Sequence, residues 1–151
     1  MKRQNADKRS GTCPSTYKTF SLALQALVIL GKQSGNCPSS DIAKYLDSEP
    51  TVLRRILAAL AKEQMIEAKE GRVGGYRLAK DAEDITLADV YAVLHLHDAR
   101  CSSMLEATGD HAFGEQMKAA MKDVLEDIDQ SLMKVLNAYS IADLMGKIKL
   151  K

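Results

Sequence analysis

The sequence lacks a long hydrophobic run. No segment approaches the roughly 18 consecutive apolar residues that suggest a membrane-spanning helix. The apolar stretch 22–30 covers only nine residues and is interrupted by Gln25. The first 16 residues are polar and lack the apolar centre of a secretory signal. These absences predict a cytoplasmic protein with no membrane partner.

Cysteine is scarce: Cys13, Cys37 and Cys101 lie far apart in the chain. Three cysteines at such spacing indicate neither a disulfide framework nor a zinc ribbon, and in a cytoplasmic chain they are thiols by default. Cys13 and Cys37 each precede a proline, which favours extended or turn backbone. Thiols in basic, mobile surroundings oxidise readily. All three are candidate redox residues, with Cys13 favoured by its basic neighbours, and incidental thiols are the alternative.

Patterns that support catalysis or metal binding are also missing. The glycine-rich segment 71–75 lacks the Lys-Ser/Thr ending of a phosphate-binding loop, and no nucleophile with a base and an orienting group is visible. His95, His97, Cys101 and His111 form the one candidate set of metal ligands. Histidines two residues apart on a regular helix point about 200° away from each other. We therefore expect no enzymatic activity, no metal and no cofactor.

The net charge of +1 conceals an uneven distribution. Residues 1–80 hold 14 basic and 7 acidic residues, a balance of +7, whereas residues 81–151 hold 7 and 13, a balance of −6. Such asymmetry suggests a basic half that faces a polyanion and an acidic half kept away from it. Unevenly solvated faces are the alternative.

Periodic apolar residues predict three helices in the basic half. The first covers about 16–32 and ends before Cys37-Pro38, after which a serine N-cap starts a short helix over 41–46. Pro50 suits the first turn of a third helix that runs to about Gln64. Its outward face is basic with small residues, namely Thr51, Arg54, Arg55, Ala58 and Lys62. Two short helices joined by a tight turn, the second basic on its outside, are typical of a helix-turn-helix.

The segment 65–78 has the pattern of a β-hairpin. The run Met65–Lys69 leads into the glycine-rich turn that carries Arg72, and Tyr76-Arg77-Leu78 suits a second strand. A hairpin placed directly after a helix-turn-helix is the arrangement with which winged-helix proteins contact a second part of the duplex.

The acidic half is predicted to be helical with one irregular segment. Thr86 with Asp89, and Ser140 with Asp143, form capping-box pairs before helices at about 87–95 and 141–147. The stretch 97–109 is expected to be irregular. A long helix over 114–137 then carries apolar residues at steps of three and four, namely Met117, Met121, Val124, Ile128, Leu132 and Val135. This stripe predicts a homodimer, and packing on the protein's own domain is the alternative.

The order of these elements resembles the Rrf2 family of bacterial transcriptional regulators. The resemblance covers about residues 16–145 and rests on three segments: PTVLRRIL at 50–57, GRVGGYRLA at 71–79 and DITLADVY at 84–91. It implies a mainly α fold in which a winged helix-turn-helix domain with a two-stranded β wing precedes a long C-terminal dimerisation helix.

The same resemblance bears on cofactors. Iron–sulfur members of the family carry three closely spaced cysteines between the helix after the wing and the long helix. Here that region holds only Cys101, and one thiol cannot ligate a cluster. The chain therefore resembles the cluster-free members, which sense thiol chemistry, a small molecule or a partner protein.

We expect four regions: a flexible basic arm (1–14), a winged-helix DNA-binding domain (15–96), an effector segment (97–113), and a dimerisation helix with a short C-terminal helix (114–151). The expected function is that of a sequence-specific regulator, a homodimeric repressor that binds a palindromic operator in double-stranded DNA. A helical protein–protein adaptor without specific DNA binding is the alternative.

Candidate DNA contacts come first from the helix-turn-helix. Ser39 and Ser40, at a helix N-terminus, are suited to phosphates. Thr51, Arg54 and Arg55 are expected to face the major groove, where arginine pairs bidentately with guanine. For one of the two arginines, an ion pair with an acidic residue at 47 or 49 is the alternative.

The wing supplies the remaining candidates. Arg72 is expected on phosphates or in the minor groove. Gly74 and Gly75 are expected to let the backbone approach the duplex closely.

Overall fold

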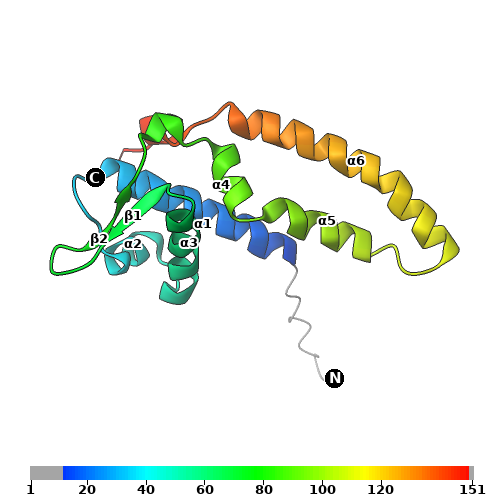
Figure 1. The fold of residues 1–151 in the computed structure, drawn as a ribbon, viewed down its shortest axis with the longest axis horizontal. Helices are drawn as coiled ribbons and strands as arrows, with labels where there is room; N and C mark the ends of the chain where they lie inside the picture. Colours follow the sequence, from blue (N-terminus) through cyan, green and yellow to red (C-terminus); the bar gives the residue numbers. More distant parts are fainter. Residues whose placement is uncertain (1–11, 150–151) are drawn as a thin grey trace, which may run out of the picture.

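A computed structural model describes residues 12–149, except for the side chains of residues 12–16 and 97–100. The elements follow the order α1 (Thr12–Lys32), α2 (Ser39–Leu46), α3 (Pro50–Lys62), β1 (Ile66–Lys69), β2 (Gly75–Leu78), the 3₁₀ turn η1 (Ala82–Asp84), α4 (Leu87–Val93), α5 (Leu96–Glu106), α6 (Ala112–Asn137) and α7 (Ile141–Lys147). The predicted fold class, mainly α with a two-stranded wing and a long late helix, is confirmed. Figure 1 shows α5 and α6 extending together away from the remaining elements.

The central helix is α1, which contacts α2, α3, α4, α5, α7 and β2. It begins at Thr12, four residues earlier than the sequence suggested, so Cys13 lies in a helical first turn. The expectation of extended or turn backbone at Cys13 was wrong, because a proline in the first helical turn costs no intrahelical hydrogen bond. Residues 1–11 of the basic arm expected over 1–14 lie outside the described residues. Residues 12–14 belong to α1.

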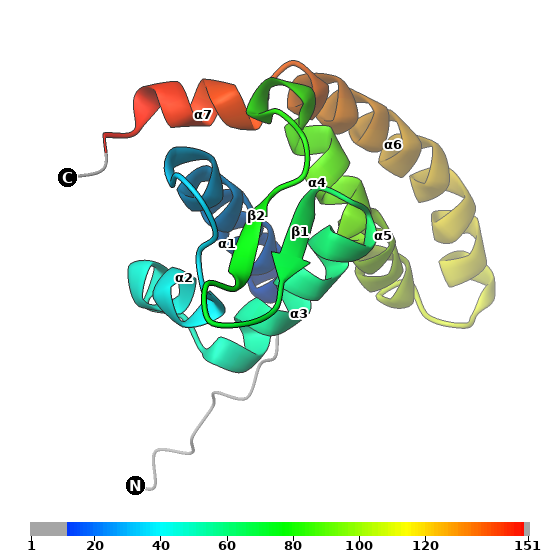
Figure 2. The same ribbon diagram turned by 60° about the vertical axis from the view of Figure 1, so that its left-hand side comes forward.

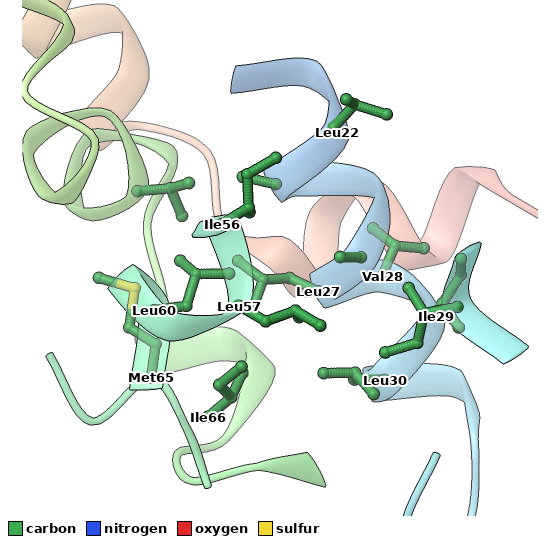
Figure 3. Packing of buried hydrophobic residues seen from close by; sticks show 14 of the residues in the cluster. Leu22, Leu27, Val28, Ile29, Leu30, Ile56, Leu57, Leu60, Met65 and Ile66 are labelled. Atoms are coloured by element: carbon green, nitrogen blue, oxygen red, sulfur yellow. The ribbon is translucent and has the colours of Figure 1, made fainter. Parts of the chain in front are cut away.

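The hydrophobic core lies between α1, α3 and the start of β1 (Figure 3). On α3 the buried residues recur every three or four positions: Leu53, Ile56, Leu57 and Leu60. They pack on Leu27 and its neighbours on α1. Burying one such side chain contributes about 1.5–3 kcal/mol. The same periodicity leaves the opposite face of α3 in solvent, which fixes the side that can meet a partner.

The predicted hairpin is confirmed. Strands β1 and β2 pair antiparallel, with Ile66 opposite Leu78 and Lys69 opposite Gly75. Ile66 is buried against the core, while Glu67 and Arg77 form an ion pair on the outer face. The loop between the strands, residues 70–74, is the wing tip, and it projects beyond the sheet (Figure 2).

Both predicted capping boxes are present. The Thr86 hydroxyl accepts from the Asp89 amide at 3.1 Å, and the Ser140 hydroxyl accepts from the Asp143 amide at 3.2 Å. Hydrogen bonds from the backbone and side chain of Ser140 lower the pKa of Asp143. The two caps also lie side by side, since Thr86 and Ser140 form an antiparallel bridge. This bridge ties the segment after α6 back to the start of α4.

The expectation of an irregular stretch over 97–109 was wrong, because most of this stretch belongs to helix α5. His95, in left-handed conformation at φ 52°, separates α5 from α4. A tight turn then leads into α6, where the His111 imidazole Nδ1 accepts a 3.0 Å hydrogen bond from the Gly114 amide. Helices α5 and α6 thus form an antiparallel hairpin, seen on the right of Figure 1.

Candidate nucleic-acid interface

The outward face of α3 is basic and exposed. Thr51, Arg54 and Arg55 are all exposed on this helix. Among the described side chains, no ion pair includes Arg54 or Arg55. The alternative of an ion pair to an acidic neighbour is therefore not seen in the described part of the chain. Two guanidinium groups without ion-pair partners are suited to recognise phosphate or guanine.

Ser39 and Ser40 are the first two residues of α2. The expected serine N-cap was wrong: Pro38 occupies the cap position at φ −61° and ψ 147°, with no side-chain hydrogen bond. The helix starts early because Cys37 is held in a bridge to Tyr76, after which Pro38 turns the chain into α2. Both serines still lie in the first turn, where amide groups point outward and favour an anion.

The wing tip carries Arg72 and Val73, both exposed. It is closed by a 3.0 Å hydrogen bond from the Gly74 amide to the Gly71 carbonyl oxygen. In Figures 1 and 2, α2, α3 and the wing lie on the opposite side of the molecule from α6. The basic candidates therefore share one side, away from the acidic long helix.

Gly74 and Gly75 have a structural role that the sequence did not reveal. A Cβ on Gly74 would collide with the carbonyl oxygens of Lys69 and Gly71. A Cβ on Gly75, whose φ is 140°, would lie 2.6 Å from the carbonyl oxygen of Cys37. Both positions accommodate the protein's own backbone, so these glycines shape the wing whether or not DNA approaches them.

The link between α1 and α2, residues 33–38, contacts the wing at two successive residues. The Asn36 Nδ2 donates to the Val73 carbonyl oxygen at 3.0 Å. Cys37 exchanges two backbone hydrogen bonds with Tyr76, of 2.9 and 2.8 Å. Sequence reasoning missed Asn36, since a contact across 37 residues leaves no local signal in one sequence.

The cysteines differ in their surroundings. Cys37 is buried, 4% exposed, and burial, followed by the nearby carboxylate of Asp41, raises the pKa of its thiol. Cys101 is half-buried on α5 and lines a cavity of about 410 Å³ between α5 and α6, together with Leu105 and Leu125. The side chain of Cys13 lies outside the described residues. Because the thiolate is the reactive form, the burial and raised pKa of Cys37 disfavour its reaction.

The described members of the candidate metal set do not form a metal site. Within the described residues, no group of three or more His, Cys, Asp or Glu side chains could hold a metal ion. His111 caps α6, and His95 occupies the left-handed junction before α5. The side chain of His97 is not among those that the structure describes.

Helix α6 has two apolar faces. Leu125 is buried on the side toward α5. Phe113, Val124, Ile128 and Val135 are exposed, Val124 to 56% and Val135 to 57%, and Met121 is half-buried among them. These residues recur at helical spacing along a second face, which we call the outer stripe. Exposed apolar stripes are a common feature of interaction surfaces.

A helix-turn-helix with a basic outward second helix, followed by a hairpin, defines the winged-helix class of DNA-binding folds. A family model described as "Rrf2: Iron-dependent Transcriptional regulator" matches residues 16–147. The chain belongs to the Rrf2 family of transcriptional regulators, as its sequence motifs predicted.

Relatives support this assignment. The chain is 35% identical over 110 residues to a protein of Rhodopseudomonas palustris named "Putative HTH-type transcriptional regulator BadM". The match covers 73% of this chain and 67% of that protein. It is 29% identical over 127 residues to the HTH-type transcriptional regulator IscR of Photorhabdus laumondii, covering 80% and 76%. The protein is accordingly a transcriptional regulator and not an enzyme.

Solved structures show the same fold. IscR of T. potens superposes with a TM-score of 0.65 at 23% identity, covering 87% of this chain and 85% of that one. CymR, the global cysteine regulator of B. subtilis, superposes with a TM-score of 0.64 at 18% identity, covering 87% and 95%. At these identities the likeness concerns the fold alone. Across residues 12–149, no helix is both long and apolar enough to cross a membrane.

The iron in the family description does not fit the residues of this chain. Iron–sulfur clusters need several thiolates that converge on one site. The three cysteines instead lie in the first turn of α1, in the link before α2, and on α5. This donor set does not suit a cluster.

Proposed function

We propose that the protein is a homodimeric repressor that binds a palindromic operator. Two copies of α3 enter successive major grooves through Thr51, Arg54 and Arg55, and the wings contact the flanks through Arg72. The serines at the start of α2 hold phosphates. The protein acts in the cytoplasm and uses no iron–sulfur cluster.

One observation carries this proposal: Arg54 and Arg55 are exposed on α3, on the side of the molecule that bears the wing, without an ion pair in the described chain. Charge elsewhere agrees with this orientation. Helix α6, on the far side, holds five acidic and three basic residues. A polyanion is therefore attracted to one side of the protein and repelled from the other.

The outer stripe of α6 supports the dimer. Most of its residues are exposed among the described residues, although Phe113 stacks on His111 and Met121 is half-buried, while Leu125 of the same helix is buried toward α5. A second copy of α6 offers a matching apolar face, and twofold symmetry suits a palindromic operator.

Substitution of the arginines tests the recognition surface. Arg54→Ala and Arg55→Ala should each weaken binding to the operator by about 1–3 kcal/mol and relax specificity at one base pair. Fluorescence anisotropy with operator and scrambled duplexes measures both effects. Lys134→Ala, which removes the same charge from exposed α6, is the matched control and should change little. Unchanged specificity in both arginine variants would show that the recognition surface lies elsewhere.

The signal is proposed to be thiol oxidation or a small molecule that acts through the segment 97–113. Helix α5 lies in this segment, contacts α1, α4 and α6, and carries Cys101 at the α5–α6 cavity. A change at the cavity would alter how the α5–α6 arm meets the DNA-binding half. The separation of the two α3 helices in the dimer would then change.

A further inference from the structure

We propose that Asn36 is a positioning residue for the wing. It holds the wing tip, residues 70–74, so that Arg72 and the recognition helix α3 reach one duplex together. This inference rests on the DNA-binding function proposed above and assigns a role to a residue outside the interface itself.

The hairpin alone does not fix where its tip lies. Each strand is only four residues long, and the tip closes on itself through the Gly74 amide and the Gly71 carbonyl oxygen. Short hairpins are marginally stable by themselves. Among the described residues, Asn36 supplies a hydrogen bond to the tip from outside the hairpin, from its Nδ2 to the Val73 carbonyl oxygen at 3.0 Å.

The side-chain oxygen of Asn36 indicates why asparagine is present at this position. The Asn36 Oδ1 is buried and has no hydrogen-bond partner among the described residues. A buried, unpaired oxygen is unfavourable. The carboxamide is therefore explained by what its NH₂ group does, which is to hold the Val73 carbonyl.

The neighbouring residues make the attachment rigid. Cys37 pairs with Tyr76, and Gly75 has no side chain where the Cys37 backbone passes. Two residues later, Ser39 begins α2. The link of residues 33–38 thus joins the wing to the start of the helix-turn-helix, so both elements move as one body.

Preordering of the tip has a consequence for binding. A loop that is already fixed loses less conformational entropy when it meets its partner. Without the Asn36 hydrogen bond, the tip must be ordered when DNA binds. The loss of affinity should then depend on Arg72, because Arg72 is the tip's charged contact.

The first experiment measures the tip in the full-length protein without DNA. Asn36→Ala should raise hydrogen exchange at the Gly74 amide by about tenfold, while the core amide of Leu57 stays protected. Gln33→Ala is the control, because Gln33 lies in the same link and its amide donates at 3.5 Å to the Tyr45 hydroxyl instead of the wing. Unchanged exchange at Gly74 in Asn36→Ala would overturn the proposal.

The second experiment is a double-mutant cycle on operator binding. Asn36→Ala should weaken binding by about fivefold in the wild-type background and by less than about twofold in the Arg72→Ala background. Equal effects in both backgrounds would mean a general loss of folded protein and would contradict positioning through Arg72. If the wild-type protein binds no DNA, the proposed function fails. Exchange at Gly74 then still decides whether Asn36 holds the tip.

Discussion

At the scale of single residues, two cysteines in the same sequence context, each before a proline, lie in different structural surroundings. Cys13 and Cys37 both precede proline, yet one lies in a helical turn and the other in a bridge to the wing. Burial of Cys37 raises its thiol pKa, and Asp41 adds to the effect. The thiolate fraction at neutral pH is therefore smaller than that of an unperturbed thiol.

This difference predicts how fast Cys37 reacts. In a Cys13→Ser/Cys101→Ser variant, Cys37 should be alkylated by iodoacetamide at pH 7 roughly tenfold more slowly in the folded protein than in urea, because the thiolate is the nucleophile. The rate should rise with pH as the thiol ionises. Equal rates in the folded and unfolded protein would contradict this prediction.

The complementary variant, Cys37→Ser, retains Cys13 and Cys101. Under thiol sensing, mild oxidation should change its operator affinity, and an intersubunit disulfide should give a dimer band on a non-reducing gel. If neither change occurs while the wild-type protein responds to oxidation, the sensing thiol is Cys37. If the wild-type protein does not respond either, a small molecule remains as the proposed signal.

At the scale of elements, the outer stripe of α6 makes the dimer testable. Val124→Asp places a charge on both copies in a twofold interface, where an unpaired buried charge is strongly unfavourable. The dimer dissociation constant should rise by at least about tenfold, which corresponds to roughly 1.4 kcal/mol. Sedimentation equilibrium measures it. Because Val124 is 56% exposed in the single chain, helix content should not change.

Gln116→Asp is the matched control for this variant. Gln116 is exposed on α6 outside the outer stripe, and the substitution adds the same charge. It should leave the dimer intact. A dimer that withstands Val124→Asp would show that the copies meet elsewhere or that the protein is a monomer.

Most elements could be predicted because their signals are local. The α3 periodicity, the glycine-rich hairpin and the two capping boxes each depend on residues within a few positions of one another. Helix α5 was missed because its apolar residues do not recur at helical spacing. Its helical state depends instead on contacts with α1, α4 and α6.

The residues of the candidate site could be predicted only where a local sequence pattern determines their position. Helical periodicity was sufficient to place Arg54 and Arg55 on the exposed face of α3. The same reasoning could not find Asn36, whose partner lies 37 residues away. It expected Gly75 to let DNA approach, which stays a prediction, and it did not reveal that the Cys37 backbone lies against Gly75. Long-range backbone contacts are what one sequence does not disclose.

At the scale of the whole molecule, α6 is tied to the rest of the chain at both ends. Helix α5 precedes α6 and packs on α1, while the bridge between Thr86 and Ser140 holds the segment after α6. Pairing of the outer stripes would therefore fix the distance between two α3 helices. The same stripe would also suit a protein–protein adaptor, so dimerisation alone does not separate the two functions.

Binding to the promoter upstream of the protein's own gene, measured against salt concentration, tests the central claim most directly. A regulator that neutralises six to ten phosphates should lose about 10³–10⁵ in affinity between 50 and 200 mM salt, as counterions are released. We expect that steep fall, with one dimer bound per palindromic site. A flat response to salt, or no binding to the promoter, would contradict the proposed function and favour the adaptor.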